Sequence, residues 1–307
     1  MARLPVLLDH DGGVDDFLTT ILLLTMDHVE TVGIVVTPGD CYAAPAVSAT
    51  RKILDLMGHS EVPVAESTVR GLNPFPRLWR RHSFSVDLLP ILNEREEIGA
   101  PLVRESGQRF MVRVLREAVE PVTLLVTGPL TTVALAMAMA PEIESKIRAI
   151  VWMGGALNVP GNVSPLMEGG QDGSAEWNVY WDPPAAERVW RSAIPIVMCP
   201  LDITNHVPVT PEFIVQLSRQ RHHPLSDLAG QCYALVAHQD AYFWDVLTTA
   251  YLGIPDAFTL AEWETSVVVS GPSQGRTQVQ PGGRTIQALD TVDLDRFYSY
   301  VLEQWAR

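Results

Sequence analysis

Residues 6–16, VLLDHDGGVDD, are an apolar run that ends abruptly on four aspartates, Asp9, Asp11, Asp15 and Asp16. The apolar run has the composition of a buried strand, and the residues from the second valine onward, VDDFLTTILLL, have the apolar spacing of a helix. The aspartates therefore follow the carboxyl end of a strand, where parallel α/β sheets bind their ligands. The two glycines between them allow the backbone to turn sharply. Carboxylates this close repel one another, so we predict that an oxygen-preferring divalent cation lies between them.

Asp15 and Asp16 have a second interpretation. Acidic residues in the first turn of a helix often serve as caps or complement the helix dipole, without any ligand. That explanation does not extend to Asp9 and Asp11, which follow an apolar strand. A bound cation explains the whole cluster, whereas capping explains only its second half.

Short apolar runs alternate with helical patterns along the first two-thirds of the chain. The expected strands are residues 31–37, 121–127, 147–153 and 194–200, and the expected helices are residues 44–57, 105–119, 131–140 and 183–192. Short late strands are expected within 265–289 and a closing helix at 293–305. The alternation predicts an α/β fold with a doubly wound, mostly parallel sheet flanked by helices and an active site at the carboxyl ends of the strands. No linker or repeat divides the chain, so we expect one domain over residues 1–307.

Composition narrows the possible functions. The 307 residues carry a net charge of −14, which argues against a nucleic-acid backbone as partner. No stretch is long and apolar enough to span a membrane and no signal peptide begins the chain, so we expect a cytoplasmic protein without membrane contact. Three scattered cysteines form neither a disulfide framework nor a zinc site. The phosphate-binding pattern GxxxxGK[ST] is absent, which favours an uncharged or weakly charged substrate.

Two long irregular stretches and several strand ends supply further polar residues. Residues 67–100 are rich in Pro, Arg and Trp, and residues 154–182 are rich in Gly, Asn and Pro. Loops of this length inside a compact domain are more often functional than idle. Asp40 follows the second expected strand, Thr127 follows the strand at 121–127, and Asp245 begins a late helical pattern. These residues are expected to converge with the first aspartates on one crevice.

The segment DHDGGVDD resembles the DxDxGxDD signature of the inosine–uridine-type nucleoside hydrolase superfamily. The resemblance continues in order through VTGPLTTVA (126–134), VWMGGALNVPGN (151–162), AEWN (175–178) and Asp245, and so covers most of the chain. It implies a Ca²⁺ ion held by Asp11, Asp16, Asp245 and the carbonyl oxygen of Thr127. Hard oxygen donors without His or Cys suit that ion.

The resemblance also implies roles in catalysis and sugar binding. Asp11 would take a proton from a water whose acidity the cation raises. Asp9 would orient other groups rather than bind the metal. The remaining residues would surround the sugar: Asp15 at the ribose hydroxyls, Asn162, Glu176 and Asn178 at the rest of the ribose, and Met153 at the pocket floor. Asn158 is the nearby substitute for Asn162, because the loop that follows is longer than in many relatives.

Departures from the common family pattern bear on the base. Many members carry His, the proposed acid, immediately before the late metal-binding Asp, whereas this chain has Trp244. Together with Asp40 and the segment FPRLWRR, this resembles the purine-specific inosine–adenosine–guanosine branch, in which two tryptophans sandwich the base. Trp79 is the candidate for the second one. Stacked indoles favour a protonated purine, and Asp40 would hydrogen-bond that base. Both tryptophans could instead be packing residues.

Three alternatives remain open from the sequence. His82, which titrates in the range of a proton donor, would serve a pyrimidine- or broad-specificity hydrolase. A calcium-dependent nucleoside- or sugar-binding protein without turnover would use the same aspartates. A phosphatase of the haloacid-dehalogenase type also begins with a strand and DxDG, but it needs a well-placed lysine, and Lys52 and Lys146 both fall in helical patterns. By analogy with the family, we expect a homo-oligomer, a dimer or tetramer, that binds a small nucleoside.

Overall fold

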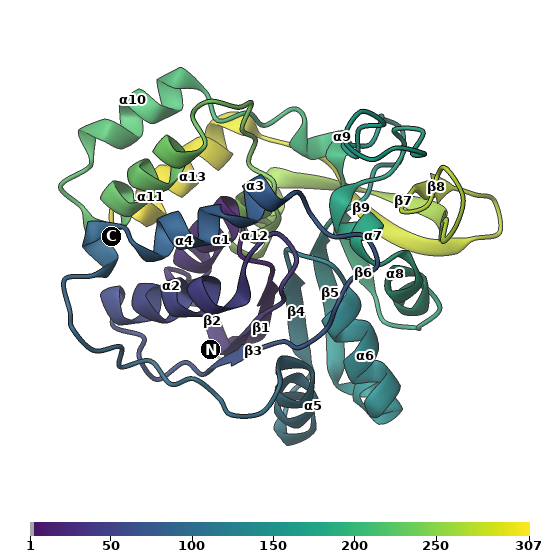
Figure 1. The fold of residues 1–307 in the computed structure, drawn as a ribbon, viewed down its shortest axis with the longest axis horizontal. Helices are drawn as coiled ribbons and strands as arrows, with labels where there is room; N and C mark the ends of the chain where they lie inside the picture. Colours follow the sequence, from purple (N-terminus) through teal and green to yellow (C-terminus); the bar gives the residue numbers. More distant parts are fainter. Residues whose placement is uncertain (1–2) are drawn as a thin grey trace.

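The computed structural model describes residues 3–307, in which one nine-stranded sheet forms the centre of the fold (Figure 1). The order across the sheet is β3-β2-β1-β4-β5-β6-β9-β7-β8. Strands β1 to β6 and β9 pair in parallel, and β7 is antiparallel to both β8 and β9. This confirms the predicted mostly parallel, doubly wound sheet. The strands are β1 (Leu4–His10), β2 (Val29–Val36), β3 (Val64–Glu66), β4 (Val122–Val126), β5 (Ile147–Met153), β6 (Ile196–Cys199), β7 (Phe258–Val267), β8 (Thr277–Val279) and β9 (Arg284–Val292).

Helices cover both faces of the sheet, and alternate residues of each strand pack into one or the other of two cores. Leu8 packs with one set of helices and its neighbour Leu7 with the other, as the two-residue period of a strand requires. The first set is α1 (Val14–Leu24), α2 (Ala43–Leu56), α11 (Pro224–Leu235), α12 (Asp245–Gly253) and α13 (Leu294–Trp305). The second is α5 (Gly107–Glu117), α6 (Thr131–Met139) and α8 (Pro183–Trp190).

Strand β1 lies between β2 and β4, which is the point where the chain reverses its direction of travel across the sheet. The connections after β1 and β4 leave toward opposite faces there, and ligands bind in the crevice that results. Strand β1 runs to His10, so Asp9 is part of the strand, and only Asp11, Gly12 and Gly13 separate it from α1. The fold thus places the predicted aspartates beside Thr127, at the ends of two adjacent strands.

The structure departs from the predicted elements in the last third of the chain. The late antiparallel strands begin at Phe258, seven residues before the predicted boundary. The prediction missed these residues because most of β7 is exposed or half-buried, so the strand lacks a continuous apolar run. Between β6 and β7 lie helices that the sequence patterns did not predict, including α11, and the predicted helix that begins at Asp245, which is α12. The same stretch of the chain also contains α9 (Leu201–Thr204) and α10 (Pro211–Arg219).

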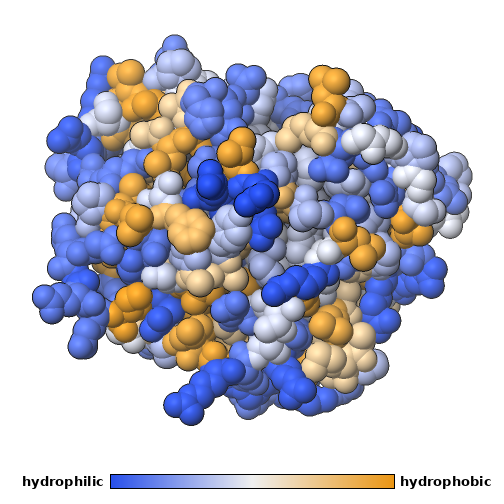
Figure 2. All heavy atoms as spheres, in the orientation of Figure 1, coloured by the Kyte–Doolittle hydropathy of each residue, from blue (hydrophilic) through white to orange (hydrophobic). Residues whose placement is uncertain are grey.

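The two long irregular stretches contain short helices. Residues 67–100 include α3 (Arg77–Arg80), α4 (His82–Asp87) and a 3-10 turn (Pro90–Leu92), and residues 154–182 include α7 (Trp177–Trp181). Further 3-10 turns lie at Pro141–Lys146 and Pro255–Ala257. Hydrophobic residues on the face shown in Figure 2 are scattered among hydrophilic ones. Among residues 3–307, no helix combines the length and apolar character that crossing a membrane requires.

Candidate active site

A pocket of about 300 Å³ opens at the carboxyl ends of β1, β4 and β5. Most of its polar lining is acidic, and most of its apolar lining is aromatic. The acids are Asp11, Asp15, Asp16, Asp40, Glu176, Asp240 and Asp245, and the aromatic residues are Phe75, Trp79, Trp177, Tyr233, Tyr242 and Trp244. His82, Thr127, Met153, Asn162 and Asn178 also line it. Every residue predicted for metal, sugar or base contact therefore lies at one pocket.

Asp11 is held at the pocket floor by its close neighbours. Its side chain is 3% exposed, and its Oδ2 accepts the backbone N–H of Asp40 at 3.0 Å. A Cβ atom on Gly128 would come within 2.6 Å of the Asp11 Cβ, and one on Gly39 would collide with the Asp11 carboxylate. Glycines at the ends of β2 and β4 therefore leave the room that this carboxylate occupies.

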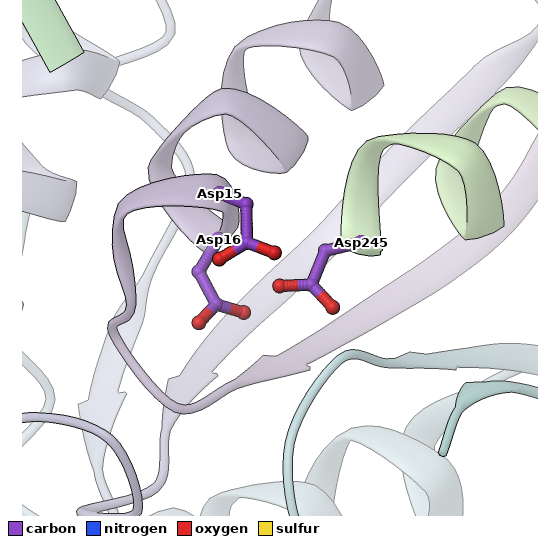
Figure 3. Close-up of side chains that lie close together, drawn as sticks. All are labelled: Asp15, Asp16 and Asp245. Carbon is purple, nitrogen blue, oxygen red and sulfur yellow. The ribbon is translucent and has the colours of Figure 1, made fainter. Parts of the chain in front are cut away.

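Three further carboxylates meet where two helices begin. Asp15 and Asp16 lie in the first turn of α1 and Asp245 in the first turn of α12, and their side chains point toward one another (Figure 3). One oxygen atom of each lies within 4.8 Å of the others. Asp16 also accepts the Gly13 N–H at 2.8 Å and the Thr127 hydroxyl at 2.5 Å, so its position is fixed by both strand ends.

Burial and mutual repulsion raise the pKa values of these carboxyl groups. Burial, followed by the charge of Asp15, raises the pKa of Asp16 to about 7. Burial and then the neighbouring aspartates raise the pKa values of Asp11 and Asp245 well above the ordinary range. Among the described residues, the pocket lining includes no Lys or Arg to neutralise them. The donors are all hard oxygen atoms, which fit Ca²⁺, and a doubly charged ion would offset the repulsion.

Glu176 and Asn178, both predicted to contact the sugar, lie at the start of α7. The Glu176 carboxylate accepts backbone N–H groups from Gly155 at 2.8 Å and from Asn178 at 3.0 Å, and it is 2% exposed. The Asn178 amide donates to the carbonyl oxygens of Met153 at 3.1 Å and Thr127 at 3.4 Å. These bonds connect α7 to the ends of β4 and β5, including the carbonyl predicted to bind the cation.

The structure distinguishes between the two asparagines considered for the sugar. Asn162 lines the pocket, and its side-chain oxygen accepts the Trp177 N–H at 3.0 Å. Asn158 is exposed and outside the lining, and its backbone N–H donates to Asp202 at 2.8 Å. Asn162 therefore remains the candidate.

Both candidate tryptophans line the pocket. Trp79, in α3, meets Trp177 edge-on with ring centroids 5.4 Å apart, and Phe75 stacks on Trp177 with ring centroids 5.3 Å apart. Trp244 precedes α12 and packs beside Met153, while its ring centroid lies 5.7 Å from that of Tyr242. The sandwich of a base between the two rings stays a prediction.

Sequence reasoning missed four of the six aromatic residues that line the pocket, together with the lining segment that precedes α12. Trp177 lies inside the AEWN motif, and Phe75 in the FPRLWRR segment, so both could have been selected from motifs already noted. Tyr233 and residues 236–242, which connect α11 to α12, carry no recognisable motif. Their proximity to the pocket depends on helices that strand–helix alternation does not predict.

Two other predictions concern residues behind or away from the pocket. Asp9 is 1% exposed, accepts the Thr37 hydroxyl at 2.6 Å and does not line the cavity, as expected of an orienting residue. Lys52 bonds Asp87 at 2.8 Å and Lys146 bonds the Ala118 carbonyl at 3.0 Å. Neither lysine reaches the aspartates, so the phosphatase alternative lacks its phosphate-binding cation.

Comparison with known proteins decides the family. The model of the family described as inosine-uridine preferring nucleoside hydrolase matches residues 6–299. The chain belongs to this family. A solved nucleoside hydrolase from Bacillus anthracis, described as inosine-uridine preferring, is 43% identical over 99% of both chains, with a TM-score of 0.96. The pyrimidine-specific ribonucleoside hydrolase RihA of Klebsiella pneumoniae is 33% identical over 95% of this chain and 94% of its own. A purine-preferring ribonucleoside hydrolase from Gardnerella vaginalis is 26% identical over 98% of both chains, with a TM-score of 0.80.

Membership in the nucleoside hydrolase family confirms the resemblance drawn from the aspartate motif. The relatives include pyrimidine-specific and purine-preferring enzymes, so family membership leaves the base preference of this hydrolase open.

Proposed function

We propose that this nucleoside hydrolase cleaves the N-glycosidic bond of ribonucleosides with Ca²⁺, prefers purines, and releases the free base and ribose. The observation that carries this proposal is the single pocket in which buried aspartates face aromatic side chains. The acidic floor suits a cation and sugar hydroxyl groups, and the aromatic wall suits a planar base.

We propose for the floor residues the roles that the family resemblance implies, which their position and chemistry support. Asp11, Asp16, Asp245 and the Thr127 carbonyl would hold the ion, which when bound would raise the acidity of a water and orient the ribose hydroxyls. Asp11, confined between glycines, is proposed as the base that takes the proton of the attacking water. Asp15 is proposed to accept hydrogen bonds from the ribose. Asn162, Glu176 and Asn178 would contact the rest of the sugar above Met153.

The residues that contact the base determine how this leaving group departs. Cleavage builds positive charge on the ribose and negative charge on the departing base, so protonation of the base lowers the barrier. Trp244 occupies the position before Asp245 and offers no proton. We propose that Trp79 and Trp244 stack on the base and favour its protonated form, which Asp40 would bind. The larger area of a two-ring base favours purines in such a stack.

A second candidate specificity rests on His82. Its side chain lines the pocket, and the RihA relatives are pyrimidine-specific enzymes. Burial and the neighbouring His238, whose ring centroid is 6.5 Å away, lower the pKa of His82, which makes its proton easier to give up. In a pyrimidine-specific hydrolase, His82 would be the acid that protonates the departing base.

Ribose release from inosine, adenosine, guanosine, cytidine and uridine distinguishes the two specificities. Purine preference predicts a higher kcat/KM for the first three, and Trp244→Ala is expected to lower kcat by about 3- to 30-fold, the equivalent of one cation–π contact. Trp263→Ala, in β7 and outside the pocket, is the control. Faster cleavage of uridine together with loss of turnover in His82→Ala would replace the purine assignment by the pyrimidine one.

A further inference from the structure

We infer that this pocket selects nucleosides whose base carries a fixed positive charge, such as N-alkylated purines or pyridinium ribosides. The inference rests on the proposed function and names a substrate class for the same site. It follows from the charge of the lining on the base side and from the residues that face the base.

The pocket lining contains more acidic residues than the cation and the sugar require. Of the seven acids in the lining, Asp11, Asp16 and Asp245 are assigned to the ion, Asp15 to the ribose, and Glu176 is already bonded to backbone N–H groups. Asp40, which the proposed function places beside the base, and the exposed Asp240 are the two acids that remain for the base. Oδ1 of Asp40 is buried and has no hydrogen-bond partner among the described residues. Asp240 comes from the connection between α11 and α12.

Positive charge near the pocket is scarce. Among the described residues, His82 is the only basic side chain in the lining, and burial together with His238 lowers its pKa, which disfavours the charged form of the ring. The charge of the Arg80 guanidinium opposes the rise in the pKa of Asp40, but Arg80 does not line the pocket. Its Nε donates to the Cys41 carbonyl at 3.1 Å, and its guanidinium lies 4.6 Å from the centre of the Tyr42 ring. The Arg80 side chain is therefore committed outside the pocket.

The aromatic wall provides the second element of cation recognition. Trp79, Trp177 and Trp244 line the cavity together with Phe75, Tyr233 and Tyr242. The faces of aromatic rings carry partial negative charge, and rings that surround a cation bind it more tightly than a neutral group of the same size. A charged carboxylate beside such rings adds Coulombic attraction that a neutral base does not receive. Burial and then Asp15 and Asp16 raise the pKa of Asp40, and a cationic base beside it would favour its charged form.

A cationic base also removes the need for a proton donor. When the bond between the ribose C1′ and the ring nitrogen breaks, the electron pair goes to that nitrogen, and the base departs as a neutral molecule. The oxygen of water forms the new bond to C1′, and Asp11 takes the water proton. The products are ribose, the neutral base and one proton. A pocket with Trp244 where many relatives carry a histidine can complete this reaction without an acid.

Binding measured apart from turnover tests the inference, because cationic nucleosides are intrinsically labile. We would compare nicotinamide riboside with uridine, a neutral nucleoside that also has one six-membered ring, by calorimetry on the Asp11→Asn variant with Ca²⁺. We expect nicotinamide riboside to bind about fivefold more tightly or better. Adding Asp240→Asn should reduce that ratio by about threefold, whereas Asp290→Asn, which changes an exposed acid outside the pocket, should not.

A second measurement covers the case in which Asp11→Asn fails to fold or to bind Ca²⁺. In the otherwise unchanged enzyme, Asp240→Asn should lower the ratio of kcat/KM for nicotinamide riboside to kcat/KM for uridine, and Asp290→Asn should leave this ratio unchanged. Equal binding of the two nucleosides, or a ratio insensitive to Asp240→Asn, would overturn the inference. Ribose release from inosine is followed in parallel. If ribose is released from inosine but the kcat/KM ratio does not respond to Asp240→Asn, the proposed hydrolase function stands and only the preference for cationic bases is wrong.

Discussion

Asp11 is the residue on which the proposed chemistry depends most. Its carboxylate lies at the pocket floor, bonded to the Asp40 N–H at 3.0 Å, with its pKa raised first by burial and then by Asp16 and Asp40. Asp11→Asn keeps the shape of the side chain but removes the base, so we expect kcat for inosine to fall by about 10²- to 10⁴-fold. Circular dichroism should show an unchanged fold. Near-normal kcat in a folded variant would remove Asp11 from the role of base.

The glycine beside Asp11 provides a sharper test of geometry. A Cβ on Gly39 would collide with the Asp11 carboxylate, so Gly39→Ala should displace it and lower kcat by about tenfold or more, because misplacement of about 1 Å is costly in catalysis. Gly230→Ala is the matched control, since a Cβ there meets no atom within 4 Å. Activity of Gly39→Ala equal to that of the control would show that the carboxylate tolerates displacement.

At the scale of elements, the hairpin β7–β8 holds the turn at Gly155 and Ala156, which in turn contacts Glu176, a residue predicted to bind the sugar. The Thr277 hydroxyl, fully buried, accepts the Ala156 N–H at 2.9 Å and donates to the Ala156 carbonyl at 3.0 Å. The adjacent Gly155 N–H bonds Glu176 at 2.8 Å, so the hairpin fixes the turn that positions the start of α7.

Thr277→Val removes both hydrogen bonds without changing the side-chain shape. We expect a loss of about 1–3 kcal/mol in the free energy of unfolding, because the Ala156 groups lose a buried partner, together with a KM that rises more than kcat falls. Thr277→Ser should restore both. Thr265→Val, a buried threonine in β7 outside the pocket, is the control for stability loss alone. An unchanged KM in Thr277→Val would reduce this residue to a structural one.

The elements that sequence patterns predicted are those whose burial requires a continuous run of apolar residues in the sequence. Strands β4 and β5 are buried on both faces and matched their predicted ranges closely, and α1 began at Val14 as expected. The half-exposed β7 and the helices α9 to α11 have weaker sequence patterns, because tertiary contacts rather than local pattern decide them, whereas α12 begins at Asp245 as predicted. Tyr233 and residues 236–242 reach the pocket only through those helices, which is why no motif indicated them.

At the scale of the whole molecule, the buried carboxyl groups couple stability to pH and to metal. In the protein without metal, burial raises the pKa of Asp16 to about 7, above the value of about 3.9 in an unfolded chain. The folded state then binds the proton more tightly. The stabilisation of the fold by the proton on Asp16 is fully present below about pH 4 and is lost as the pH rises through about 7.

Ca²⁺ competes with protons for the same oxygens, so its stabilising effect should grow over the same range. We expect the difference in Tm between Ca²⁺-loaded and chelated protein to be larger at pH 8 than at pH 5. Thermal unfolding followed by circular dichroism at the two pH values measures it. A Tm difference independent of pH would indicate that the ion does not bind these carboxylates.

The most direct test of the account is ribose release from inosine by chelated protein before and after Ca²⁺ is added back, with bound metal measured in both states. The account predicts that turnover is lost when the metal is removed and returns as one ion per chain binds. It predicts further that Asp245→Asn prevents this recovery. Undiminished turnover by protein shown to hold no metal would contradict the assignment of the aspartate cluster as a cation site.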